Sequence, residues 1–202
     1  MAGWVDRFAA RHGDVDVRAT EGGIALCAPD GATATLAAPW PCAAATVADL
    51  VAQVQQRQTV GLLLVRRGGY AVGVAEGADL VVSKVGRRHV QGRTRAGGWS
   101  QQRYARRRDA QAREAFGAAA DAATRTLLPH LSRLRGLVTG GDRRAVASVM
   151  EDPRLRPLAT LPQSTFLAVP DPRMRVLEDA VHRSRAVIID VSDPLHDTKQ
   201  PH

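Results

Sequence analysis

The chain has 202 residues, of which 45% are apolar and 24% are charged, as is usual for a globular protein. Its formal net charge of +8 favours a polyanion as the partner. The N-terminus contains early acids and lacks the apolar core of a signal peptide, and the longest apolar run, Val60–Val65, is too short to span a membrane. These observations predict a cytoplasmic protein without membrane contact.

The N-terminal part of the chain combines short strands with two helices. Trp4 and Phe8 are four residues apart in an amphipathic pattern, which predicts a helix over residues 2–12. Three apolar stretches separated by turn residues predict strands at Val15–Thr20, Gly23–Ala28 and Ala32–Ala37. Thr46 is a suitable N-cap for a helix that ends near Gln56.

The rest of the chain starts with three more strands and then alternates helices with strands. The first strands are predicted at Thr59–Val65, Tyr70–Val74 and Asp79–Lys84. Residues 85–101 form a long protruding loop without a consistent period. Ser100 is a suitable N-cap for the long helix after it, which Pro129 interrupts. Later strands are predicted at Gly136–Thr139, Thr165–Val169 and Ala186–Val191, and later helices end near Met150 and Ser184.

This order of elements predicts an α/β protein, in which a mixed sheet carries packed helices (an α+β arrangement). The strands first follow one another directly and later alternate with helices, so both antiparallel and parallel pairs are expected. We expect a single domain over residues 1–192 and a flexible tail over residues 193–202.

The positive charge is concentrated in one stretch, Lys84–Arg113, here called the basic segment. It contains ten basic residues and one acid, a net charge of +9, which exceeds the +8 of the whole chain. A disordered basic loop would have a similar composition. A coding preference for arginine, of which the chain has 26 against two lysines, explains the choice of arginine but not its clustering. Because the planar guanidinium suits phosphate groups, we expect the segment to bind nucleic acid.

Ten residues of the basic segment are candidate nucleic-acid contacts. They are Lys84, Arg87, Arg88, Arg93, Arg95, Trp99, Gln102, Arg103, Arg106 and Arg107. The cations would pair with phosphates, and Trp99 would stack on a nucleotide of a single-stranded end. Within the tip, defined as residues 97–102, Gly97 and Gly98 allow the backbone to lie close against a ligand.

We expect neither a metal site nor a cofactor. Asp142, Asp171, Asp190 and Asp193 are scattered over the ends of different elements, whereas a two-metal site needs carboxylates that converge. No spacing of Ser, His and Asp, or of Cys and His, indicates a nucleophile with its own base. The glutamines of the tip can orient a water molecule but cannot take a proton. Such a tip suits a substrate that is already activated, or a partner that supplies most of the site.

The sequence Gly97-Gly98-Trp99-Ser100-Gln101-Gln102, followed by Arg103-Tyr104-Ala105-Arg106, resembles the tip of the catalytic middle domain of eukaryotic and archaeal peptide-chain release factors. That tip reads Gly-Gly-Gln-Ser, and a helix with an Arg-aromatic-Ala-Arg pattern follows it. Trp99 stands where the release factors have glutamine. The order Gly98-Trp99-Ser100-Gln101 instead fits the G-x-x-Q arrangement of the Vms-type release-factor-like proteins of ribosome quality control. The chain is thus similar to that family, and its composition suggests a bacterial, actinobacterial member.

The resemblance implies a release-factor catalytic-domain-like fold, related to the RNase H-like arrangement but without its metals. It implies a peptidyl-tRNA hydrolase that frees nascent chains from stalled ribosomes, with peptidyl-tRNA, rRNA and the large ribosomal subunit as partners and no cofactor. Gln101 would position the attack, while Gly97 and Gly98 would let the tip enter the RNA. Two alternatives stay open: an endonuclease that cuts the tRNA near its 3′ end, and a non-catalytic basic RNA- or ribosome-binding module.

Overall fold

The computed structural model describes residues 1–87 and 100–194, and for residues 100–112 it describes the backbone alone. The chain forms two compact units, one made of Met1–Gln56 with the residues from Arg185 onward and the other of Arg57–Ser184. Each unit has its own hydrophobic core. Of the tail expected at 193–202, the residues from 195 onward lie outside the described part.

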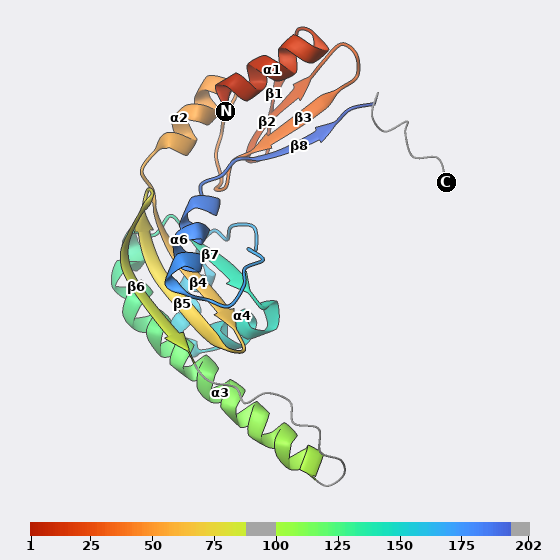
Figure 1. Cartoon of the computed structure of the whole chain (residues 1–202). Helices are drawn as coiled ribbons and strands as arrows, with labels where there is room; N and C mark the ends of the chain where they lie inside the picture. The colour runs from red at the N-terminus through yellow and green to blue at the C-terminus, as the bar shows by residue number, and fades with distance from the viewer. Residues whose placement is uncertain (88–99, 195–202) are drawn as a thin grey trace. The chain divides into compact units, whose positions relative to one another are not determined.

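In the first unit, two helices accompany a four-stranded antiparallel sheet (Figure 1). The elements are α1 (Ala2–His12), β1 (Asp16–Thr20), β2 (Gly23–Cys27), β3 (Thr33–Ala37), α2 (Val47–Gln55) and β8 (Ile188–Ser192), and the strand order is β1-β2-β3-β8. Because side chains alternate along a strand, Ile24, Leu26 and Leu36 share the buried face of the sheet. Thr46 caps α2 as the sequence predicts, since its hydroxyl accepts the backbone N–H of Asp49.

A mixed four-stranded sheet lies at the centre of the second unit. Its strands are β4 (Thr59–Arg66), β5 (Gly69–Glu76), β6 (Asp79–Arg87) and β7 (Gly136–Gly141), in the order β6-β5-β4-β7. β4 is antiparallel to β5 and parallel to β7. Residues 60–65 of β4 are all buried, which is typical of a central strand covered on both faces. The mixed sheet and the α/β class predicted from the sequence are confirmed.

Helices cover both faces of this sheet. They are α3 (Ser100–Leu127), α4 (Arg143–Met150), α5 (Arg156–Ala159) and α6 (Met174–Arg183), with the 3₁₀ turns η1 (Leu128–Arg133) and η2 (Pro153–Leu155). Ala119 and Ala123 of α3 share a core with Val72 of β5. The next residue, Gly73, faces the opposite side, where a side-chain carbon of Leu177 in α6 lies 3.1 Å from the position of a Cβ.

The longest helix, α3, ends at a proline. Pro129 lies in the first turn of η1, where its ring and its missing N–H stop the α-helix, as the sequence predicts. α3 has 28 residues but is polar along much of its length. Within residues 1–87 and 100–194, no helix combines the length and the apolar character that crossing a membrane requires.

The segment after α5 is not the strand that the sequence predicts at Thr165–Val169. It runs beside β7 and forms isolated parallel bridges, from Gln163 to Leu137 and from Leu167 to Gly140. Between these bridges β7 advances three residues and its neighbour advances four, so that one extra residue interrupts the ladder. The prediction was wrong because an apolar pattern reports burial and does not report continuous backbone pairing.

Gly141, at the end of β7, has a backbone conformation that favours glycine. Its φ is 104°, and a Cβ there would overlap the carbonyl oxygen of Val65. We expect Gly141→Ala to lower the free energy of unfolding by roughly 1–3 kcal/mol. Gly68→Ala is the matched control, because Gly68 has open space around it, and it should change the free energy by less than about 0.5 kcal/mol. Equal losses for the two variants in urea denaturation would contradict this prediction.

Candidate nucleic-acid interface

The basic segment lies between two described elements, β6 and α3. β6 continues to Arg87, three residues beyond the predicted strand end at Lys84, and α3 begins at Ser100. Residues 85–87 and 100–101 of the expected loop therefore belong to regular elements. Lys84 and Arg87 are exposed on β6. Six predicted site residues lie outside the described part of the chain, namely Arg88, Arg93, Arg95, Gly97, Gly98 and Trp99.

Five further predicted site residues belong to the N-terminal end of α3. They are Gln101, Gln102, Arg103, Arg106 and Arg107. Ser100, the predicted N-cap, is instead the first helical residue. The two glutamines therefore lie in the first turn of the helix, and the three arginines lie within its first two or three turns.

The start of α3 extends beyond the sheet on which the helix packs (Figure 1). Near the other end of α3, a methyl carbon of Leu127 lies 3.4 Å from the position of a Cβ on Gly61, close to the beginning of β4. From Gly61 to its last residue, β4 is about 17 Å long. From Leu127 back to its first residue, α3 is about 40 Å long, so the helix extends past the end of the strand. Ala115 is the first residue of α3 that is described as buried. The glutamines and arginines at the start of α3 are therefore carried past the body of the unit.

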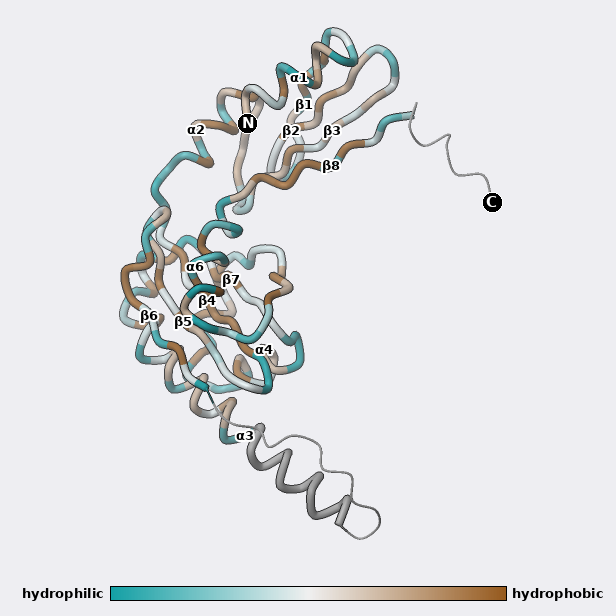
Figure 2. The backbone as a smooth tube through the Cα atoms, in the orientation of Figure 1, coloured by the Kyte–Doolittle hydropathy of each residue, from teal (hydrophilic) through white to brown (hydrophobic). Residues whose placement is uncertain are grey.

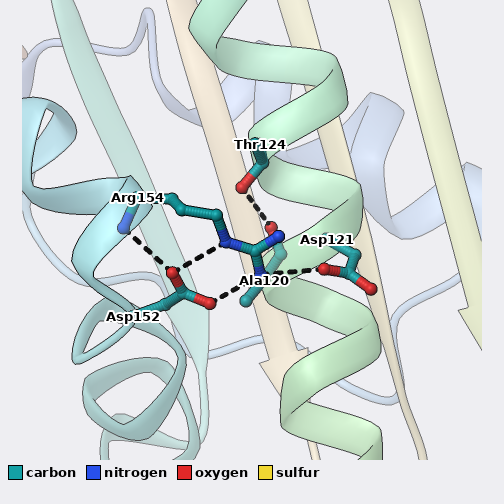
Figure 3. A network of polar contacts seen from close by, with 5 residues as sticks. All are labelled: Ala120, Asp121, Thr124, Asp152 and Arg154. Carbon is teal, nitrogen blue, oxygen red and sulfur yellow. Dashed lines mark hydrogen bonds and ion pairs between the residues drawn. The ribbon is translucent and has the colours of Figure 1, made fainter.

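A polar network holds the last third of α3 against η2 (Figure 3). The side chain of Arg154 donates to the two carboxylate oxygens of Asp152 at 2.9 and 2.7 Å and lies 2.8 Å from Asp121 of α3. Hydrogen bonds from the side chain and the backbone N–H of Arg154 lower the pKa of Asp152 to about 2. Beside this network the hydroxyl of Thr124 donates to the carbonyl of Ala120 at 2.9 Å. The network therefore joins α3 to η2 through charged side chains.

Replacing Arg154 with alanine should weaken this attachment more at neutral pH than in acid. Because the pKa of Asp152 in the folded protein lies below its ordinary value of 3.8, the stabilisation is present above about pH 4 and is lost as the pH falls toward 2. We expect Arg154→Ala to lower the Tm by roughly 1–3 °C at pH 7 and the deficit to shrink in acid. The control is Arg156→Ala, which removes an exposed arginine of α5. A deficit of equal size at pH 7 and pH 2.5 would count against the ion-pair explanation.

The four acids weighed as metal ligands are divided between the two units. Asp142 caps α4, and Asp171 lies 3.8 Å from the guanidinium of Arg66. Asp190 belongs to β8 and Asp193 follows it, both in the first unit. Within the described residues, no three His, Cys, Asp or Glu side chains form a group that could hold a metal ion.

Four exposed arginines near the base of the basic segment are not among the predicted site residues. They are Arg66, Arg67, Arg143 and Arg144. The signal that could have identified them is an arginine pair close to a glycine pair, which occurs at residues 66–69 and again at residues 140–144. Their common location depends on strand pairing, which the local sequence does not reveal.

Comparisons with known proteins give one family and two structures to consider. A family model described as Actinobacteria/chloroflexi VLRF1 release factor matches residues 58–190. No curated protein matches the chain. The crystal structure of the archaeal translation termination factor aRF1 is similar with a TM-score of 0.43 and 18% identity, over 81% of this chain and 50% of that chain. A second structure, described as an archaeal protein, has a TM-score of 0.39 and 17% identity, over 77% of this chain and 48% of that chain.

The chain spans about half the length of both solved structures. The family match covers well over half of the chain, from the start of β4 into β8, and includes the whole basic segment. It confirms the resemblance to an actinobacterial release-factor-like protein that the tip and the following helix indicated. The chain belongs to the Actinobacteria/chloroflexi VLRF1 release factor family.

Proposed function

We propose that this protein frees nascent chains from peptidyl-tRNA on stalled large ribosomal subunits. Membership of a release factor family relates the protein to translation. The observation that best supports the proposal is the position of Gln101, in the first turn of a helix that projects beyond its sheet. Two glycines and a tryptophan precede this turn in the sequence. The protein would act in the cytoplasm, as part of ribosome quality control.

The proposed reaction is hydrolysis of the ester that joins the peptide to the tRNA. The oxygen of a water molecule bonds to the ester carbonyl carbon, the bond from that carbon to the ribose oxygen breaks, and the ribose oxygen takes up the proton that the water gives up. The amide of Gln101 would orient the water and stabilise the charge that develops on the carbonyl oxygen. Gly97 and Gly98 would allow the backbone to approach the ester closely.

Cations on both sides of the tip would hold the RNA. Lys84 and Arg87 are exposed at the end of β6, and Arg103, Arg106 and Arg107 lie in the first turns of α3. A guanidinium can pair with a phosphate through two parallel N–H groups, which gives orientation as well as affinity. The acceptor stem of the tRNA and the rRNA around it would supply these phosphates.

The reaction products distinguish this proposal from its two rivals. Purified large subunits that carry a labelled peptidyl-tRNA are incubated with the protein, and the 3′ end of the tRNA is resolved on a gel. Ester hydrolysis, the expected result, gives free peptide and a tRNA with an intact 3′ end. A shortened tRNA, with the peptide still joined to a nucleotide fragment, would identify an endonuclease instead. Intact peptidyl-tRNA would identify a non-catalytic binding module.

A further inference from the structure

At one end of the sheet in the second unit, the arginines outnumber the ion pairs that they form with described acids. It is the end at which β6 finishes and leads toward the tip. Five exposed arginines lie there, at the end of β4 and the turn after it, at the end of β6 and at the start of α4. They are Arg66, Arg67, Arg87, Arg143 and Arg144, here called the sheet-end arginines. Only Arg87 belongs to the basic segment.

The pairing of the strands makes these residues neighbours. Arg66 pairs with Gly69 and Gly69 pairs with Arg87, so that about 10 Å, or two strand spacings, separates the two arginines. On the other side Gly141 pairs with Val65 and leads directly into α4. The sheet-end arginines therefore form a band roughly 15 Å across. Figure 2 shows hydrophilic colour at the turn between β4 and β5 and at the start of α4.

Two of the sheet-end arginines have partners inside the protein. Arg66 donates to the carbonyl of Val169 at 3.0 Å and lies 3.8 Å from Asp171. The guanidinium of Arg143 lies 4.3 Å from the centre of the Phe166 ring, a cation–π contact. These contacts fix the segment before α6 against the end of the sheet.

The other three sheet-end arginines, Arg67, Arg87 and Arg144, form no ion pair within the described residues. The nearby carboxylate of Asp142 is engaged as the cap of α4, where it accepts the backbone N–H groups of Arg144 and Ala145 at 2.9 and 3.3 Å. As far as the described residues go, three guanidinium groups are thus available to a partner.

At the opposite end of the same sheet, arginines are matched by acids. Arg57 lies 3.3 Å from Asp79, and Arg133 lies 3.2 Å from Glu76. These two acids are paired residues at the turn between β5 and β6. A coding preference for arginine would act on both ends of the sheet alike, so it does not account for a surplus at one end.

We propose that the sheet-end arginines bind the phosphate backbone of the RNA whose 3′ end meets the tip, so that the RNA-binding surface continues from the basic segment onto the body of the unit. This inference rests on the proposed function and adds a second contact area to it. Arg87 belongs to both areas, which makes the surface continuous along β6. A protein partner would also need apolar anchors. The exposed large apolar residues described in this unit, Val81 and Met174, are not part of the end of β6, the β4–β5 turn or the start of α4.

The test compares two double variants in their binding to deacylated tRNA between 50 and 300 mM salt. Arg67→Ala/Arg144→Ala removes two sheet-end arginines without an ion pair. Arg125→Ala/Arg156→Ala removes the same charge from the last turn of α3 and from α5, which packs beside η1 at the other end of the unit. We expect the first variant to bind about 10- to 40-fold more weakly at 100 mM salt. Its log–log salt slope should fall by roughly 1.4–1.8, because two phosphate contacts are lost. The second variant should change little.

Equal losses of affinity in the two variants would overturn the proposal, since only net charge would then matter. A sheet-end variant that binds tRNA normally but no longer binds polyglutamate would also overturn it, in favour of an acidic protein partner. Peptide release by the wild-type protein is measured separately. If the wild-type protein releases peptide but the sheet-end variant has the same tRNA salt slope as the wild type, the second contact area alone is refuted. If the variant's slope changes but the wild-type protein releases no peptide, the proposed reaction alone is refuted.

Discussion

Replacing Gln101 with alanine is expected to slow peptide release by about 10²- to 10³-fold, because one amide that stabilises developing charge contributes that much in comparable sites. Binding to the large subunit and the Tm should barely change. Gln101 lies at the start of α3, well before Ala115, the first residue of the helix that is described as buried. Single-turnover release from stalled large subunits gives the rate, and calorimetry gives the Tm.

Two neighbours of Gln101 provide matched controls. Gln102→Ala carries the same chemical change one residue later, and successive residues of a helix point about 100° apart, so only one of the two amides can face the ester. We expect Gln102→Ala to have a mild effect on the release rate. Trp99→Ala should raise the subunit concentration needed for half-maximal rate, because a stacking contact is lost. If Gln102→Ala abolishes release and Gln101→Ala does not, the acting residue is misassigned; if neither matters, the tip is not catalytic.

Reversing Arg106 and Arg107 to glutamate is expected to weaken binding to large subunits by about 10- to 100-fold at 0.1 M salt. Each arginine that pairs with a phosphate displaces counterions, and the log–log salt slope changes by about 0.7 to 0.9 per contact. The introduced carboxylates add repulsion from the same phosphates. Both positions lie in the part of α3 before the described core contacts, so the protein should still fold. Co-sedimentation over a series of salt concentrations measures the affinity.

The control for this reversal has the same change in net charge at another place. Arg125 and Arg156 are exposed, and their reversal to glutamate leaves the start of α3 intact. We expect this control to reduce affinity much less than the reversal at Arg106 and Arg107. An affinity that does not depend on salt, or an equal loss in the control, would show that phosphate contacts at the start of α3 do not hold the protein on the ribosome.

Elements that are determined by residues within them or next to them could be predicted from the sequence. β4 was predicted because six successive apolar or small residues lie between polar turns, and these residues are buried in the structure. The break after α3 was predicted because Pro129 cannot continue a helix, and α2 was predicted from its cap at Thr46. The tip was identified from residue types in a short stretch of sequence. In each case the physical cause lies within a few residues of the element.

Features that depend on pairing between distant residues could not be predicted. The last strand, β8, joins the first sheet, where Ile189 pairs with Leu36. The sequence of neither strand identifies the strand with which it pairs. That return of the chain adds Ile189 to the core of the first unit, which is separate from the core of the second. Four of the sheet-end arginines, all except Arg87, were missed for the same reason, since Arg66 and Arg87 become neighbours only through Gly69 of the strand between them.

The claim on which the proposed function depends most is that the tip meets the 3′ end of peptidyl-tRNA. A photoreactive aromatic amino acid in place of Trp99 keeps a ring at that position and allows crosslinking on stalled large subunits. The expected result is a crosslink to the last nucleotides of the tRNA, which is lost when the tRNA is removed beforehand. Crosslinks that form only to RNA or protein far from that end, while the protein remains bound, would contradict the claim.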